Sequence, residues 1–124
     1  GALDRLDAIA ARHPDLKLVI DHVGLNVRGT APNVFEDLPR VCALAKHPNV
    51  AVKASGMPSL SRESYPFRDL HPHIRTLVEA FGPRRTFWGT DLCTKELPGL
   101  MGEDLEWVMG RGVCEWLGWR RKQS

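Results

Sequence analysis

Residues 16–24, LKLVIDHVG, decide the fold: a run of apolar residues leads straight into a charged pair, Asp21 and His22, and then a glycine. A short run rich in Leu, Val and Ile is typical of a strand that is buried on both faces. Two later segments have the same form, NVAVKASG at 49–56 and RTFWGTD at 85–91. The sequence therefore predicts three similar strands, each ending in polar residues and glycine.

Each predicted strand follows an amphipathic helix that a proline or glycine stops. The stops are HPD at 13–15, HPN at 47–49 and Gly82-Pro83, where the glycine suits a left-handed C-cap. Apolar residues recur at helical spacing before each stop, which predicts one buried face per helix. These stripes are Leu3, Leu6, Ile9 and Ala10 in the first helix, Leu38, Val41, Cys42 and Ala45 in the second, and Ile74, Leu77, Val78 and Phe81 in the third.

Helices that alternate with strands predict an α/β fold with parallel strands joined by helical crossovers. In barrels and in open parallel sheets, the carboxyl ends of the strands form one rim, where ligands bind. The polar strand endings should therefore converge on that rim. The residues concerned are Asp21, His22, Lys53, Ser55 and Asp91.

Composition narrows the class of protein. The 124 residues are 43% hydrophobic and 26% charged, which fits a single domain over 1–124. A formal charge of +2 gives no reason to expect a nucleic-acid partner. No run approaches the roughly 18 apolar residues of a membrane helix, and the first residues do not resemble a signal peptide, so we expect no membrane association and a cytoplasmic location.

The last segment, MGEDLEWVMGRGVCEWLGW at 101–119, predicts two further helices. Gly110 and Gly112 are expected to separate them. The tryptophans of this segment are expected to pack rather than to form a ligand platform, and apolar residues again lie at helical intervals. They are Leu105, Val108, Met109, Val113, Trp116 and Leu117.

Taken in order, LVIDHVG, NVAVKASG and LVEAFGPRRTFWGTD resemble the last three barrel strands of the amidohydrolase-related family, which includes the dicarboxylate lactonases and related decarboxylases. The ending VMGRGVCEWLGW resembles the C-terminal helix of that family. The resemblance extends from about residue 3 to about residue 119. It implies the last three βα units of a TIM (β/α)8 barrel, with an active site at the rim.

The resemblance also implies roles for individual residues. Asp91 matches an aspartate that orients or deprotonates the attacking water, and His22 matches a histidine that polarises the substrate carbonyl; either is also a candidate zinc ligand. Lys53 and Ser55 match the motif of the seventh strand and, with Asp21, are predicted to bind substrate. In lactonase-like members an arginine shortly after that motif holds a substrate carboxylate, and Arg62 is the nearby arginine here.

These residue types suit hydrolysis independently of the family. Water is a poor nucleophile at neutral pH, so a carboxylate such as Asp91 is needed as general base. The developing oxyanion needs a donor or a cation, which His22 or Lys53 can supply. A bound divalent metal would do both.

Some features of the family pattern are missing. The metal-binding His-x-His of its first strand has no counterpart, because HPH at 71–73 stands at a predicted helix start. Two ligands, His22 and Asp91, do not complete a zinc site. We therefore expect a hydrolase of a small lactone, amide or related carboxylate that is incomplete as an isolated chain and is completed by self-association or by a missing N-terminal half-barrel.

Two other functions were considered. A catalytically inactive half-barrel that serves as an assembly or binding module is the main alternative, since only three strands are predicted. An open sheet that binds a nucleotide is the weaker one, because DHVGLNVRGTA at 21–31 contains neither GxGxxG nor a P-loop.

Overall fold

The computed structural model describes residues 1–25, 33–89 and 102–119. Its centre is a sheet of three short parallel strands in the order β1-β2-β3, namely β1 (Leu18–Ile20), β2 (Val50–Ala54) and β3 (Thr86–Trp88). In the register, Ile20 lies opposite Val52, and Ala54 lies opposite Trp88. The predicted α/β class with parallel strands is confirmed.

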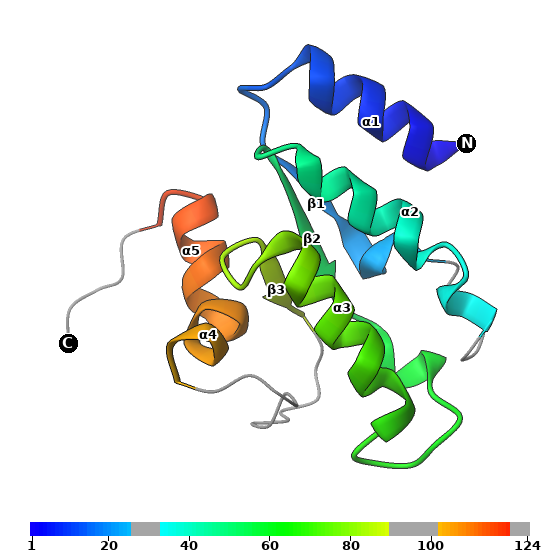
Figure 1. Cartoon of the computed structure of the whole chain (residues 1–124). Coiled ribbons are helices and arrows are strands. Elements are labelled where there is room, and N and C mark those ends of the chain that lie inside the picture. Colours follow the sequence, from blue (N-terminus) through cyan, green and yellow to red (C-terminus); the bar gives the residue numbers. More distant parts are fainter. Residues whose placement is uncertain (26–32, 90–101, 120–124) are drawn as a thin grey trace.

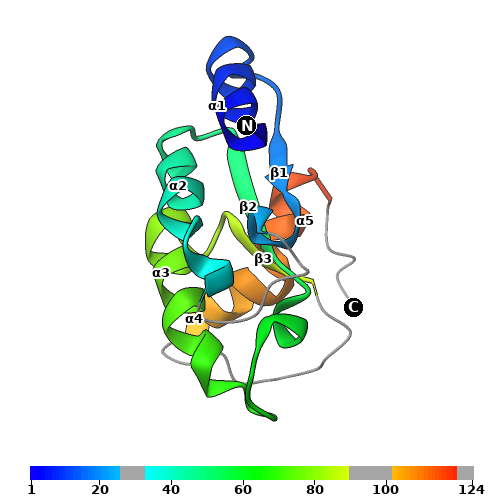
Figure 2. The same cartoon turned by 90° about the vertical axis from the view of Figure 1, so that its right-hand side faces the viewer.

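A helix precedes each strand, as the sequence predicts. These are α1 (Ala2–Arg12), α2 (Leu38–Ala43) with the turn η3 (Leu44–Lys46), and α3 (His71–Phe81). Helices α2 and α3 lie side by side on one face of the sheet, and α1 lies beside the β1 end (Figures 1 and 2). Short turns complete the connections: η1 (Asp21–Gly24), η2 (Asn33–Phe35), η4 (Met57–Leu60) and η5 (Arg68–Leu70).

The main core lies between the sheet and these helices. Alternate residues of β2 point into it, as the period of two in a strand requires. The predicted stripes of α2 and α3 also reach it, whereas Ile9 of α1 is 43% exposed, so its predicted burial is wrong. The buried residues that make this contact include Val50, Val52 and Ala54 of β2, Leu38 and Val41 of α2, and Ile74, Leu77, Val78 and Phe81 of α3.

The opposite face of the sheet is only partly covered. It carries Val19, Lys53 and Phe87, which alternate with the core residues of their strands. Phe87 is buried and meets the ring of Trp116 edge-on, with the ring centroids 6.2 Å apart. Val19 is 44% exposed. The sheet thus has one face packed against helices and a second that is open near β1.

The C-terminal segment lies beside β3 (Figure 1). It consists of α4 (Gly102–Glu106), a π-helical turn η6 (Trp107–Arg111) and α5 (Gly112–Trp116), and it breaks at Gly110, whose φ of 173° is not helical. Gly112 does not break it: this residue is helical and buried, and a Cβ there would lie 2.9 Å from the carbonyl oxygen of Arg84. Of the tryptophans expected to pack, Trp107 is buried, whereas Trp119 is 71% exposed.

Helix α3 begins and ends where the sequence predicts, but the glycine at its end has a different conformation from the one expected. Helix α3 starts at His71 with a proline in its first turn, as expected for HPH, and the His73 ring stacks on Phe35 with centroids 3.8 Å apart. The helix ends before Gly82. That glycine has a φ of 77° but a ψ of 162°, so it is not the left-handed C-cap that the sequence suggested.

One buried side chain joins α1 to the sheet. The Asn49 side-chain amide donates to the carbonyl oxygens of Ala10, His13 and Leu16 at 3.3, 3.0 and 2.9 Å. Its backbone carbonyl accepts a hydrogen bond from Leu18. Asn49 therefore holds the end of α1 and the start of β1 against β2. Within the ranges given above, none of the helices has the length and apolar character needed to cross a membrane.

Candidate active site

Four polar side chains meet where β1 and β2 end. Asp21 and His22 directly follow β1, while Lys53 and Ser55 lie at the end of β2 and share the face opposite the main core. Lys53 Nζ lies 3.1 Å from Asp21 Oδ1, and Ser55 Oγ lies 2.8 Å from His22 Nδ1. The structure thus brings together four of the residues that the sequence placed at the rim. Their catalytic and binding roles remain predictions.

Asp21 is the centre of charge in this cluster. The hydrogen bond from the Lys53 ammonium lowers the pKa of the Asp21 carboxyl below its ordinary value, and the slight burial opposes this with less effect. His22 Nε2 lies 3.3 Å from the other carboxylate oxygen, Oδ2. Asp21 is therefore ionised at neutral pH and accepts a hydrogen bond from Lys53, while the His22 ring lies beside it. Because both side chains of the Lys53 pair are well exposed, solvent screens their attraction.

A left-handed turn presents the His22 ring. Three successive residues have positive φ: His22 at 48°, Val23 at 59° and Gly24 at 68°. A β-branched residue such as valine rarely adopts this conformation, because its side chain crowds the backbone. Val23 is only 1% exposed, so its burial in the core holds the strained turn in place. Apart from the glycine, no feature of the sequence predicts this turn.

Gly89, which follows β3, makes room for Lys53. A Cβ at this position would lie 2.5 Å from Lys53 Cε and 3.3 Å from Ser55 Cβ. Because the end of a lysine side chain is flexible, a larger residue would move the Lys53 ammonium rather than unfold the sheet. Gly89 therefore sets the path of Lys53 toward Asp21.

Gly89→Ala should separate Lys53 from Asp21 and raise the pKa of the Asp21 carboxyl toward the ordinary value of about 3.9. The contribution of the pair to stability, which in the native protein is present above the ordinary value and is lost as the pH falls through the lowered pKa, would then be largely absent at every pH. An NMR titration of the Asp21 side chain measures the pKa. Lys53→Met should give the same rise. Gly110→Ala, where a Cβ meets no atom within 4 Å, should give none; an unchanged Asp21 pKa in Gly89→Ala would refute the proposed contact.

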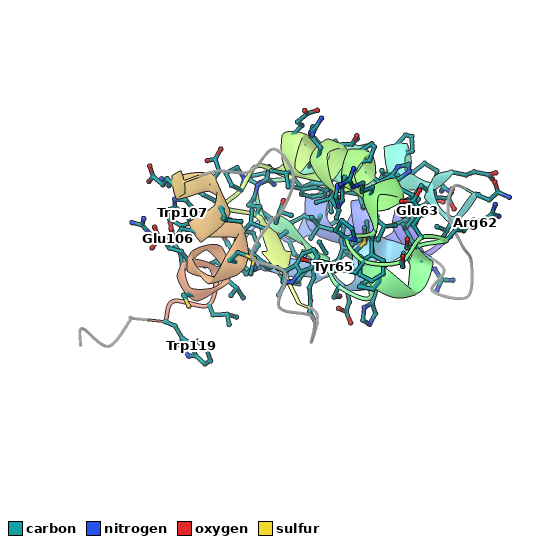
Figure 3. All side chains as sticks on the ribbon, turned by 90° about the horizontal axis from the view of Figure 1, so that it is seen from below. Arg62, Glu63, Tyr65, Glu106, Trp107 and Trp119 are labelled. Atoms are coloured by element: carbon teal, nitrogen blue, oxygen red, sulfur yellow. The ribbon has the colours of Figure 1, made fainter. Side chains whose placement is uncertain are left out.

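The predicted substrate arginine lies apart from the cluster. Arg62 is exposed at the outer edge of the molecule in Figure 3. That figure shows the molecule from below the view of Figure 1, so the carboxyl ends of the strands face the reader. Its backbone amide donates to Asp69 Oδ2 at 2.9 Å. Among the described residues, no hydrogen bond or ion pair joins its side chain to the cluster. Its role as a carboxylate ligand remains a prediction without support from the geometry.

The described residues do not fit a zinc site by themselves. Asp91 lies outside them, and within the described ranges no three His, Cys, Asp or Glu side chains gather as metal ligands. His22 Nδ1 is hydrogen-bonded to Ser55, Nε2 lies near Asp21, and Asp21 is paired with the Lys53 cation. We therefore derive no catalytic step through a metal.

Comparison with known proteins identifies the family. A model of the amidohydrolase family matches residues 3–122, almost the whole chain. The chain belongs to the amidohydrolase family. The resemblance stated from the strand endings is confirmed.

Two curated relatives are lactone hydrolases. This amidohydrolase chain is 35% identical to an L-fucono-1,5-lactonase of Burkholderia ambifaria over 90% of its own length and 38% of that protein. It is 34% identical to a 4-sulfomuconolactone hydrolase of Hydrogenophaga intermedia over 73% of its length and 30% of that protein. The chain thus spans less than two fifths of either relative.

Solved amidohydrolase structures from Burkholderia multivorans share the fold. One, which has bound zinc, superposes with a TM-score of 0.75 at 20% identity and covers 95% of this chain and 49% of that one. Another, which has bound HEPES, gives 0.56 at 26% identity and covers 94% and 42%. The arrangement of strands and helices described above is therefore found within larger amidohydrolases.

Proposed function

We propose that residues 1–124 form the C-terminal part of a (β/α)8 barrel, contributing its last three βα units. The parallel sheet and its helix-covered face support this, as does the similarity in fold to about half of a solved amidohydrolase. In such a barrel the face with Val19, Lys53 and Phe87 would line the interior, and the strand ends would form the substrate rim. The remaining strands would come from outside these residues.

The activity that we propose is hydrolysis of a small lactone; an amide or related carboxylate substrate is the broader alternative. The observation that carries it is the cluster of Asp21, His22, Lys53 and Ser55 at the strand ends of a chain similar to two lactone hydrolases. Both relatives are named for lactones that differ in their substituents. A lactone is therefore the substrate feature that they share.

The chemistry assigns the site residues complementary roles. Water attacks the lactone carbonyl, and the ring C–O bond breaks to leave a hydroxy acid. Asp91 accepts the proton of the water as general base. Lys53 or His22 stabilises the negative charge that develops on the carbonyl oxygen. One solved amidohydrolase has bound zinc. A zinc ion in this site would need ligands beyond the described residues.

The direct test is opening of L-fucono-1,5-lactone, followed through the acid that it releases, with the spontaneous rate subtracted. We expect turnover by a sample that includes the missing strands, and less or none by residues 1–124 alone. Lactone opening at the spontaneous rate by the folded, completed protein would refute a lactonase activity. An amide analogue in the same assay separates the narrower proposal from the broader one.

The second candidate function is an inactive half-barrel that acts as an assembly module. Three observations favour it. The chain spans only 38% of the length of the L-fucono-1,5-lactonase, and the sheet face at Val19 is open. A groove of about 680 Å³ also lies between α1 and the end of β1. Apolar side chains of Leu3, Leu6, Ile9 and Ile20 line much of this groove. Uncovered apolar surface of this kind favours association.

Light scattering of the purified chain tests the assembly. We expect at least twice the mass of one chain, because the open face and the edge of β1 would be covered by another copy. A sample that remains monomeric would contradict self-association and leave a separate N-terminal half-barrel as the remaining source of strands. Lactonase activity of residues 1–124 alone would rule out the inactive module.

A further inference from the structure

We infer that Ser55 is a positioning residue that fixes which nitrogen of His22 carries the proton. Ser55 is only 1% exposed, so its hydroxyl interacts with neighbouring side chains and not with solvent. Its hydroxyl oxygen lies 2.8 Å from His22 Nδ1 and 3.4 Å from Asp21 Oδ1. The consequence for catalysis rests on the proposed function, whereas the assignment of the proton does not.

The hydroxyl has one hydrogen to donate, so it serves one of these two acceptors at a time. Hydroxyl hydrogen bonds to oxygen are usually about 2.5–3.0 Å long, and the contact with Asp21 exceeds this range. The contact with His22 is short. The Ser55 hydroxyl is therefore better placed to donate to Nδ1 than to Asp21, and when it does so Nδ1 presents its lone pair and the neutral ring carries its proton on Nε2.

The other side of the ring leads to the same assignment. His22 Nε2 lies 3.3 Å from Asp21 Oδ2, and the Lys53 hydrogen bond keeps that carboxylate ionised. A proton on Nε2 places positive charge near the negative oxygen, although the two side chains lie close without forming a hydrogen bond. The opposite tautomer would set the Nε2 lone pair against the carboxylate, so the charge of Asp21 favours the Nε2–H form, and in that form the Ser55 hydroxyl can only donate to Nδ1.

The position of the ring is also restricted. The left-handed backbone at His22, with φ 48° and ψ 41°, is held by buried Val23. A Cβ at Gly56 would lie 3.4 Å from Nδ1, so the backbone passes close beneath that side of the ring. Ser55 and the turn together thus hold an N–H donor at the rim, where the His22 side chain is 48% exposed. Such a donor suits a lactone carbonyl oxygen.

The tautomer can be measured directly by NMR on the whole chain labelled with ¹⁵N in histidine. Spectra are recorded at about pH 8.5, where a histidine of ordinary basicity is neutral. The signals of His22 are those that disappear in His22→Asn; asparagine tolerates left-handed backbone. We expect the Nε2–H form to dominate in the native chain. A dominant Nδ1–H form would overturn the inference.

Ser55→Ala removes the hydroxyl and isolates its contribution. The ratio of the Nε2–H to the Nδ1–H form should fall by up to about tenfold, which is the effect of one hydrogen bond. Ser61→Ala is the matched control, because Ser61 Oγ donates to Asp69 away from His22, and it should leave the His22 signals unchanged. An unchanged ratio in Ser55→Ala, with folding verified by circular dichroism, would show that Ser55 does not position the proton.

Turnover provides a separate readout. If the completed protein opens lactones, Ser55→Ala should lower kcat several-fold with little change in KM, because the donor acts on charge that develops during attack. An equal change in KM would point to lost substrate binding, as expected if Ser55 contacted the substrate. Failure of the lactone assay would leave the NMR result intact, so the two proposals fail separately.

Discussion

Replacing Asp91 with asparagine should slow lactone hydrolysis by the completed protein about 10²- to 10⁴-fold, which is the usual contribution of a positioned general base. The amide keeps the size of the carboxylate but cannot accept a proton from water. Loss should appear in kcat and in kcat/KM together, because proton transfer belongs to the transition state. Initial rates with L-fucono-1,5-lactone measure both.

Two further Asp→Asn variants make the result specific. Asp104 is exposed on α4, so Asp104→Asn should retain full activity. Asp21 is paired with Lys53 and lies beside His22, so Asp21→Asn should disturb these two groups. We expect it to reduce the rate of hydrolysis less than Asp91→Asn does. If Asp91→Asn kept half of the native rate or more, Asp91 would not be the base, and Asp21 would become the leading candidate.

The strands and their order could be predicted because the signals are local and strong. LVI at 18–20 and VAVKA at 50–54 form the parallel strands that their apolar runs indicate. The convergence of Asp21 with Lys53 also followed from sequence, since parallel strands place their carboxyl ends at one edge. Such reasoning needs only the spacing of residues along the chain.

The rest depends on contacts that spacing does not contain. The periodicity of α1 treats Ile9 and Ala10 alike, but Ala10 is buried whereas Ile9 lines the groove between α1 and the end of β1. Met109 is exposed although Val108 beside it is buried, and both lie in the π-helical turn, where the spacing of an α-helix does not apply. Burial is decided by the partner surface as well as by the pattern.

The details of the site were also beyond sequence reasoning. Glycine after a strand is common, so nothing marked Gly89 as the residue whose missing side chain admits Lys53. Ser55 was expected at the rim but not as a buried partner of His22. Arg62 was chosen by its distance along the chain from Lys53, which does not determine where a connection of this length places it.

Asn49→Ala should reduce the free energy of unfolding by about 2–4 kcal/mol. The variant leaves the carbonyl oxygens of Ala10, His13 and Leu16 without the amide that now serves all three, and an unsatisfied buried polar group costs about 1–3 kcal/mol. Water would reach the two less buried carbonyls and limit the total. Urea unfolding followed by circular dichroism measures the change.

Matched variants separate the hydrogen bonds from the loss of volume. Asn49→Asp keeps the shape but turns a carboxylate toward carbonyl oxygens, so it should destabilise at least as much as alanine at neutral pH. Asn33 is exposed, so Asn33→Ala should change the stability by no more than about 0.5 kcal/mol. If Asn49→Ala matched that control, the amide would not be what holds α1. Because β1 leads directly to Asp21 and His22, loosening its start should also weaken the contact between Lys53 and Asp21.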